Sequence, residues 1–290
     1  MVRLRPSLEK RKVVVFKGNE VFFKSGGPTM KFEDIIYEKK DGIAKITFNR
    51  PKVYNAFRTS TLKEAAHALE DADLDDTIRA VILTGAGEKG FCTGGDTKEV
   101  AGGAGYAKDM DYWHTRVHQA MRNLTKPVIA AVNGYAIGGG NVLVTICDMA
   151  IASENAIFGQ AGPRVGSFDA GFGAAYLSRI VGEKKAREIW FLCRQYTAQE
   201  ALEMGLVNKV VPFDKLQEEA EAWCKEICNM SPTAIKFLKY AFNADTDHMH
   251  GFENMAQSAV RLYWGTEEAG EAKQAKMEKR APDWSKLRKG

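Results

Sequence analysis

The chain has 290 residues, of which 45% are hydrophobic and 27% are charged, and its formal net charge is +4. This length allows one large domain or two ordinary ones, and the composition is typical of a globular protein. The sequence contains no apolar run near the ~18 residues of a membrane span, no basic run interleaved with aromatic residues, and no signal-peptide pattern at its start. We therefore expect a cytoplasmic protein that binds neither membranes nor nucleic acids.

Residues 1–29 differ from the rest of the chain. Within them, "VVVFKGNEVFFK" (13–24) has two apolar stretches around a Gly-Asn pair, a pattern that predicts a β-hairpin. A frayed terminus or an overextended gene start explains the segment equally well, because a new and regular pattern begins at Met30.

From Met30 onward, short apolar segments alternate with amphipathic ones. Apolar patterns predict strands at 43–50, 80–86, 127–137 and 149–159, and the helical period predicts helices at 61–75, 117–124 and 141–148. Beyond residue 174 the pattern is helical at 184–193, 197–205, 214–230, 231–245 and 255–264, with 207–211 as the only clear strand. This order predicts an α/β layered fold followed by a helical C-terminal region.

The cysteines and histidines do not predict a metal site. The five cysteines, an odd number without zinc-like pairing, fit a reducing compartment in which each is a small core residue. His114 and His118 lie four residues apart on one predicted helix face, but no third ligand stands at metalloprotease spacing. We therefore expect surface histidines and no metal.

Two glycine turns carry the strongest chemical signal. "FCTGGD" (91–96) and "GYAIGGGN" (134–141) each follow a predicted strand and lead toward a helix. Glycine lets a ligand approach the unpaired backbone N–H groups at a helix start, and two such donors together could hold a developing oxyanion. For either motif alone, glycines that merely permit a tight turn are an equally good explanation.

The motifs "NRPKVYNAFR" (49–58), "GFCTGGD" (90–96) and "NGYAIGGGN" (133–141), in this order, resemble those of the crotonase (enoyl-CoA hydratase) superfamily, and the resemblance covers residues 31–284. It implies an α/β fold, the crotonase-like spiral of ββα repeats with a helical C-terminal trimerisation region, and a homotrimer or homohexamer. The expected divisions are an extension (1–29), a core (30–225) and a helical region (226–290). The resemblance also implies an acyl-CoA substrate, no tightly bound cofactor, and a thioester oxygen held by the N–H groups of Gly95 and Gly139.

The residues at two further positions argue against the namesake reaction. Hydratases that resemble this chain carry one glutamate just after the GGG turn and a second near the Gln-containing strand end. Here these positions are Val142 and Gly162. Without this pair of carboxylates, acid–base addition of water to a double bond is not expected.

A second resemblance concerns the glycine-rich loop. "FGQAGPRVGSFDAG" (158–171) and "KKAREIWFLCRQY" (184–196) resemble segments of 1,4-dihydroxy-2-naphthoyl-CoA synthases and 2-ketocyclohexanecarboxyl-CoA hydrolases. These subfamilies share a loop Ser and Asp, here Ser167 and Asp169, and the resemblance implies that Asp169 handles a proton while Ser167 hydrogen-bonds nearby. An N-cap or turn role is the simpler alternative for Asp169.

In the synthases, a bicarbonate ion occupies the space of the missing glutamate and acts as the base. The resemblance assigns this anion pocket to Gln160, Gly162 and Trp190, with Gly162 vacating the space. A core aromatic is the simpler alternative for Trp190.

The resemblance also implies tyrosine and coenzyme contacts. In the family a tyrosine near the C-terminus occupies the position that Trp264 holds in "LYWGTEE". Tyr263, one residue earlier, could take its place, but a shift of one residue turns the side chain by ~100° about the helix axis. Tyr106 is the nearest match to a second catalytic tyrosine. The expected coenzyme contacts are Arg58, Thr93, Gly94, Lys98 and, from a neighbouring subunit, Lys279, although each cation is otherwise an ordinary solvated side chain.

Two reactions remain open. Local features such as "CTGGD" and "NVLVTICD" favour hydrolytic ring opening of an alicyclic 2-oxo-carboxyl-CoA, whereas "VGSFDAG" and "EIWFLCRQY" are closer to the ring-closing synthases. We favour the hydrolase, with the synthase as the alternative. A non-catalytic RNA-binding crotonase is disfavoured, because Ser167 and Asp169 are both present.

Overall fold

The computed structural model describes residues 15–17, 20–22, 30–96, 99 and 109–287. At the N-terminus, β1 (Val15–Lys17) and β2 (Glu20–Phe22) pair antiparallel, and β3 (Met30–Lys31) adds to β2. This pairing is the one that the hairpin alternative predicts, while residues 18–19 between the two strands lie outside the described residues. Tyr106 and Lys98 lie outside the described residues.

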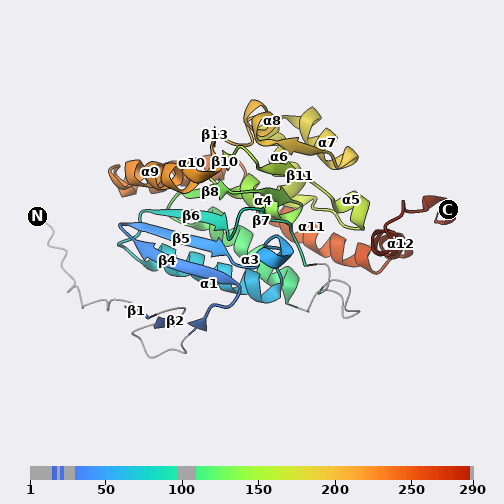
Figure 1. The fold of residues 1–290 in the computed structure, drawn as a ribbon, viewed down its shortest axis with the longest axis horizontal. Coiled ribbons are helices and arrows are strands. Elements are labelled where there is room, and N and C mark those ends of the chain that lie inside the picture. The colour runs from blue at the N-terminus through green and yellow to red at the C-terminus, as the bar shows by residue number, and fades with distance from the viewer. Residues whose placement is uncertain (1–14, 18–19, 23–29, 97–98, 100–108, 288–290) are drawn as a thin grey trace, which may run out of the picture.

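The main layer is a six-stranded sheet in the order β13-β10-β8-β6-β5-β4 (Figure 1). Its strands are β4 (Ile35–Lys40), β5 (Ile43–Phe48), β6 (Ala80–Gly85), β8 (Val128–Val132), β10 (Met149–Ser153) and β13 (Lys209–Val211). The β4–β5 pair is antiparallel and every other pair in this sheet is parallel. Parallel strands need crossover connections, which the helices provide.

Both faces of this sheet are covered, which explains its continuous apolar strands. Along β6, Val81 and Leu83 join the larger hydrophobic cluster, whereas Ala80 and Ile82 join the smaller one on the opposite face. Helices α1 (Thr59–Leu74) and α3 (Met110–Asn123) pack together, and α9 (Leu216–Cys228) packs on β6, β8 and β10. Alternate residues of a central strand thus enter different cores.

A four-stranded sheet in the order β12-β11-β9-β7 forms the second layer. Its strands are β7 (Gly90–Cys92), β9 (Tyr135–Ile137), β11 (Ile157–Gly159) and β12 (Gln195–Thr197). The chain passes from β6 to β7, from β8 to β9 and from β10 to β11, and so repeatedly gives one strand to each sheet before the next helix. This is the expected spiral of ββα repeats.

Two details of the sequence prediction were wrong. Segments 127–137 and 149–159 are each two strands, and β12 is a further strand beyond residue 174. The breaks at Asn133-Gly134 and Glu154-Asn155 turn the chain from one sheet to the other within two or three residues. Strands of three residues are too short to show a period of their own.

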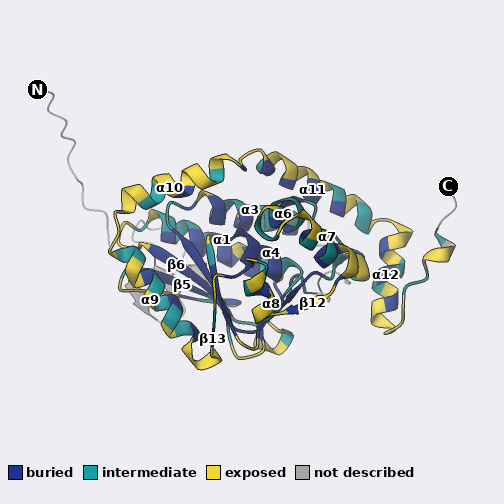
Figure 2. Ribbon diagram, turned by 90° about the horizontal axis from the view of Figure 1, so that it is seen from above, coloured by how far each residue is buried: buried dark blue, intermediate teal, exposed yellow. Residues whose placement is uncertain are grey.

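Helices dominate the C-terminal region, as predicted. Besides α9, the α-helices after the glycine-rich loop are α6 (Leu177–Val181), α7 (Glu183–Leu192), α8 (Ala198–Glu203), α10 (Pro232–Ala244), α11 (Met249–Trp264) and α12 (Glu267–Met277). Ser231 and Thr266 cap α10 and α12, since each side chain accepts a hydrogen bond from a first-turn N–H. Figure 2 shows exposed residues along the outer faces of α10 and α11.

Two predicted exclusions can be compared with the described residues. None of their helices is long and apolar enough to cross a membrane. All five cysteines are free; Cys92, Cys147, Cys193 and Cys224 are buried as expected, whereas Cys228 is only half-buried.

Candidate functional site

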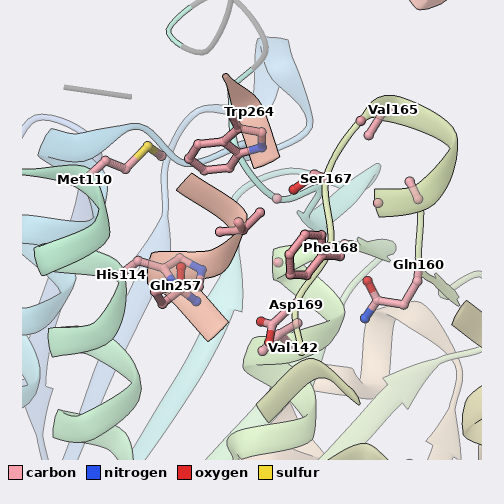
Figure 3. A pocket seen from close by; sticks show the side chains of 18 of the residues that line it. Met110, His114, Val142, Gln160, Val165, Ser167, Phe168, Asp169, Gln257 and Trp264 are labelled. Carbon is pink, nitrogen blue, oxygen red and sulfur yellow. The ribbon is translucent and has the colours of Figure 1, made fainter. Parts of the chain in front are cut away.

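A cavity of about 500 Å³ opens where the glycine turns meet the loop 158–173 (Figure 3). Helices α3, α11 and α12 contribute further residues to its wall. The sequence-predicted residues that line it are Gly94, Gly95, Gly139, Gln160, Gly162, Ser167, Asp169 and Trp190. The structure therefore brings together residues that span almost a hundred positions of the chain.

The two glycine turns touch at one end of the cavity. Gly94 has a φ of +81°, and a Cβ atom there would lie 3.0 Å from the backbone nitrogen of Gly139. Gly139 is the first residue of α4 (Gly139–Ile146), so its N–H has no partner within the helix. The other turn pairs with Phe57 in an isolated parallel β-bridge: Phe57 N–H donates to Gly94 O, and Asp96 N–H donates to Phe57 O. The N–H of Gly95 takes part in neither of these hydrogen bonds. Glycine is required here because the two backbones approach so closely.

Asp169 lies on the loop that ends at a π-helical turn, Gly171–Tyr176. Its Oδ1 accepts hydrogen bonds from Gly171 N–H at 2.9 Å and Gly173 N–H at 3.1 Å. The capping role considered from the sequence is therefore real, and the side chain also lines the cavity beside Val142 of α4 (Figure 3). Burial, with a contribution from the negative charge of Glu253, raises the pKa of Asp169 to about 6. A carboxyl with such a pKa can accept and release a proton near neutral pH.

The three residues assigned to the anion pocket all line the cavity, but they differ in what they offer. Gln160 is 2% exposed, and neither its amide oxygen nor its nitrogen has a hydrogen-bond partner among the described residues. Trp190 instead donates its indole N–H to Gly173 O, so this donor is already engaged within the protein. Gly162 has no room for a side chain, because a Cβ there would lie 2.6 Å from Ser167 O and 3.1 Å from the Trp190 ring.

Several predicted contacts lie away from the cavity. Tyr263 packs against the Phe168 ring, with centroids 5.5 Å apart, and it is Trp264 that lines the cavity. The expected rotation about the helix explains this result. Arg58 gives its Nε and Nη2 donors to Asp34, so its guanidinium is already paired. Thr93 and the exposed Lys279 are not among the described lining residues.

The cavity wall contains groups that the sequence analysis did not predict. Lys273 and Lys276 of α12 line it, and burial lowers the pKa of both ammonium groups. Asp111 of α3 lines the cavity and also a neighbouring groove between α3 and α11. Its Oδ2 lies 3.4 Å from Nη1 of Arg261, and burial raises the pKa of this carboxyl. No contiguous motif marks these residues, since they come from helices that meet only in the fold.

The expectation of surface histidines was wrong. His118 is 1% exposed, and its Nδ1 lies 3.0 Å from Oε1 of the fully buried Glu253. His114 lines the cavity, and burial together with His118 lowers its pKa to about 3. One ligand atom from each of His114, His118 and Glu253 falls within 4.8 Å of the others, a grouping that sequence spacing could not reveal.

Comparison with known proteins agrees with this architecture. Residues 38–287 match the family model described as enoyl-CoA hydratase/isomerase. The chain belongs to the enoyl-CoA hydratase/isomerase family. Membership makes coenzyme A thioesters the class of substrate, without a tightly bound cofactor.

Solved structures of this family superpose over most of the chain. A carnitinyl-CoA hydratase from Mycobacterium avium is 32% identical with a TM-score of 0.77, covering 87% of this chain and 98% of that one. An enoyl-CoA hydratase/isomerase from Xanthobacter autotrophicus is 31% identical with a TM-score of 0.77, covering 86% and 94%. An enoyl-CoA hydratase from Bacillus anthracis is 32% identical with a TM-score of 0.69, covering 87% and 98%.

Proposed function

We propose that this member of the enoyl-CoA hydratase/isomerase family hydrolyses a cyclic β-oxoacyl-CoA and opens its ring, as 2-ketocyclohexanecarboxyl-CoA hydrolases do. The observation that carries the proposal is the position of Asp169, which lines the same cavity as the Gly94–Gly95 and Gly139 turns and packs beside Val142. The positions expected for the two hydratase glutamates hold Val142 and Gly162, so hydration lacks its pair of acids there.

In the proposed reaction, the thioester oxygen lies between the N–H groups of Gly95 and Gly139. Water attacks the ring carbonyl carbon while Asp169 accepts its proton. The bond between that carbon and the α-carbon then breaks, and its electron pair forms the thioester enolate, whose oxygen the two N–H groups stabilise. Asp169 returns the proton to the α-carbon, which gives a free carboxylic acid and an open-chain CoA thioester. In comparable sites one oxyanion donor contributes about 3 kcal/mol.

Positive charge at the entrance suits the coenzyme. Lys273 and Lys276 reach the cavity from α12, and a phosphate group near them would favour their charged state, which burial disfavours. We propose these lysines as coenzyme contacts in place of the paired Arg58. We also propose Lys279 as a coenzyme contact, provided by a neighbouring subunit of a homotrimer or homohexamer.

The ring-closing naphthoate synthase reaction is the second candidate. The buried amide of Gln160, which has no partner among the described residues, favours it, because an unpaired polar group in a cavity wall fits an anion such as bicarbonate. The indole N–H of Trp190 does not support that anion site, since it bonds to Gly173 O. The hydrolase therefore remains the preferred proposal.

Two substrates separate these candidates. We expect purified protein to open 2-ketocyclohexanecarboxyl-CoA, and we expect Asp169→Asn to lower kcat by about 10²-fold or more, because the water loses its base. Glu226→Gln, at an exposed position of α9 outside the described lining residues, serves as a control with unchanged kcat. Turnover of o-succinylbenzoyl-CoA alone would establish the synthase instead, and a mild effect of Asp169→Asn would remove this carboxylate from the chemistry.

A further inference from the structure

A second carboxylate shares the backbone turn that holds Asp169. Glu253, on α11, is 0% exposed and accepts a hydrogen bond at Oε2 from Phe172 N–H at 3.0 Å. The N–H groups on either side, those of Gly171 and Gly173, donate to Oδ1 of Asp169. Three consecutive N–H groups are thus divided between two acids from distant parts of the chain.

The two glycines make this arrangement possible. A Cβ atom at Gly171 would lie 1.8 Å from Oε2 of Glu253, and one at Gly173 would lie 2.7 Å from Cγ of Asp169. Neither site can accept even a methyl group without displacing a carboxylate. The Gly-Phe-Gly sequence therefore serves the close approach of two acids on opposite sides of one turn.

His118 is the group that compensates Glu253. Its Nδ1 lies 3.0 Å from Oε1 of Glu253, and Gln257 donates its amide N–H to the same oxygen at 2.9 Å. Both His118 and Glu253 are almost completely buried, so their charges are poorly screened by water. A buried acid is retained at low cost only when it is paired and hydrogen-bonded.

We propose that the buried Glu253–His118 pair is a positioning device for Asp169, acting through the turn Gly171–Gly173 whose N–H groups both carboxylates share. This inference rests on the proposed acid–base role of Asp169 and adds two positioning residues, which lie behind the cavity and touch no substrate. The electrostatics agree with the geometry, because the charge of Glu253 raises the pKa of Asp169 and that of His118 lowers it. Burial opposes ionisation of Glu253, but the bond from His118 outweighs it and lowers the pKa of Glu253 to about 2.

Other titratable groups face this region from the packed helices. They are Asp111, His114 and Arg122 of α3, His250 of α11, and Lys273 and Lys276 of α12. The Arg122 guanidinium carbon lies 5.3 Å from the Phe172 ring centroid, and the His250 ring contacts the same aromatic side chain. Phe172 thus separates both groups from the turn, whereas Glu253 bonds to the turn directly.

A metal ion bound by His114, His118 and Glu253 is the alternative to the proposed hydrogen-bonded pair. It would have to replace the Glu253–His118 hydrogen bond, which the two facing atoms form at 3.0 Å. In that case the metal ion, and not the hydrogen bond with His118, would compensate Glu253. The two arrangements give different results below.

Two substitutions of opposite effect test the inference in the full-length protein. In the pH profile of kcat/KM, Glu253→Gln should move the acidic limb to lower pH by about one unit, because a like charge is removed. His118→Asn keeps an amide N–H near the Nδ1 position but removes the imidazole, whose contribution lowers the pKa of Asp169, and should move the limb to higher pH. Glu226→Gln, on the exposed face of α9, is the matched control and should not move it.

If the acidic limb moves in the same direction in both variants, or in neither, the inference is overturned. Loss of packing alone lowers kcat but does not shift the limb in opposite directions. A stoichiometric metal found by elemental analysis of the unaltered protein would overturn it as well. Having two variants keeps the test decisive where one of them fails to fold.

A second readout is independent of turnover. Infrared difference spectra between acidic and neutral pH report the carboxyl C=O band of a protonated acid, and the band that Asp169→Asn removes belongs to Asp169. The pH at which half of this band has disappeared should shift in opposite directions in Glu253→Gln and His118→Asn. If the unaltered protein turns over neither substrate, the proposed function fails but this titration still decides the inference.

Discussion

Asp169 uses one carboxyl group for two purposes. Its Oδ1 caps the turn at Gly171–Tyr176, and the same side chain lines the cavity. Burial and the negative Glu253 raise its pKa to about 6, so the ionised form that the proposed reaction needs is less favourable in the folded state. Activity at this residue therefore opposes stability, a conflict typical of functional sites.

We expect Asp169→Asn to raise the melting temperature at about pH 7.5 by a few degrees, because an asparagine oxygen still accepts both N–H bonds and carries no charge. The sign follows from the folded pKa of about 6, which lies above the ordinary value of 3.8. Below pH 3.8 the folded and the unfolded protein both bind the proton, and the carboxyl group does not lower stability. The loss of stability grows between pH 3.8 and about pH 6 and stays constant at higher pH.

Thermal denaturation of both proteins at about pH 4 and pH 7.5 measures this effect. The gain should be present at the higher pH and nearly absent at the lower one. An equal gain at both values would show that packing, and not the charge of Asp169, is responsible.

The sequence predicted the residues of the cavity that lie within contiguous motifs. Gly94, Gly95, Gly139, Gln160 and Asp169 all line it. The Glu253–His118 contact, by contrast, spans 135 positions, and helical periodicity treats both residues as ordinary polar members of their helices. Trp190 was placed correctly, but its hydrogen bond to a backbone carbonyl depends on the path of the turn, which no pattern of residue types specifies.

Among the elements, α10 is joined to the core through the buried cation Lys239 and through Asn243, which exchanges hydrogen bonds with Arg122. Lys239 is 5% exposed, and its Nζ donates to Met121 O and Lys126 O at 3.0 Å each and to Asp148 Oδ2 at 2.7 Å. These acceptors lie near the end of α3 and around β8, so one side chain joins three separate segments. The sequence predicted α10 from its period but not this lysine, because an amphipathic helix is expected to turn its cations to solvent.

We expect Lys239→Met to reduce the free energy of unfolding by about 3 kcal/mol, since it leaves a carboxylate and two carbonyls without their donor. Urea denaturation followed by circular dichroism measures the loss. Lys225→Met, at an exposed position of α9, is the control and should change stability by less than about 0.5 kcal/mol. A loss as small as that of the control would show that solvent reaches the site and replaces the ammonium group.

At the scale of the whole molecule, α10 and α11 carry large apolar side chains that this chain alone leaves exposed. They are Phe237, Leu238, Tyr240, Phe242, Phe252, Met255 and Leu262. Contiguous exposed apolar surface of this kind marks a protein–protein interface. It supports the proposal that residues 226–290 form an oligomerisation region in a homotrimer or homohexamer.

Phe242→Glu should dissociate this assembly, because Phe242 is 77% exposed in the single chain and a buried carboxylate in the interface would have no partner. Sedimentation velocity or light scattering measures the mass. Leu74, also 77% exposed but at the end of α1, provides the matched control in Leu74→Glu, which should leave the mass unchanged. A monomeric unaltered protein would refute the assembly.

The contact between the two glycine turns has a consequence for how the protein acquires its activity. Gly94 and Gly139 belong to successive repeats of the spiral, and Glu253 reaches the turn that holds Asp169 only from near the end of the chain. A chain arrested midway through synthesis or renaturation therefore contains helices and sheet but no competent reaction centre. During renaturation, recovered ellipticity should precede recovered turnover, so that catalytic rate reports the last docking event and not the gain of secondary structure.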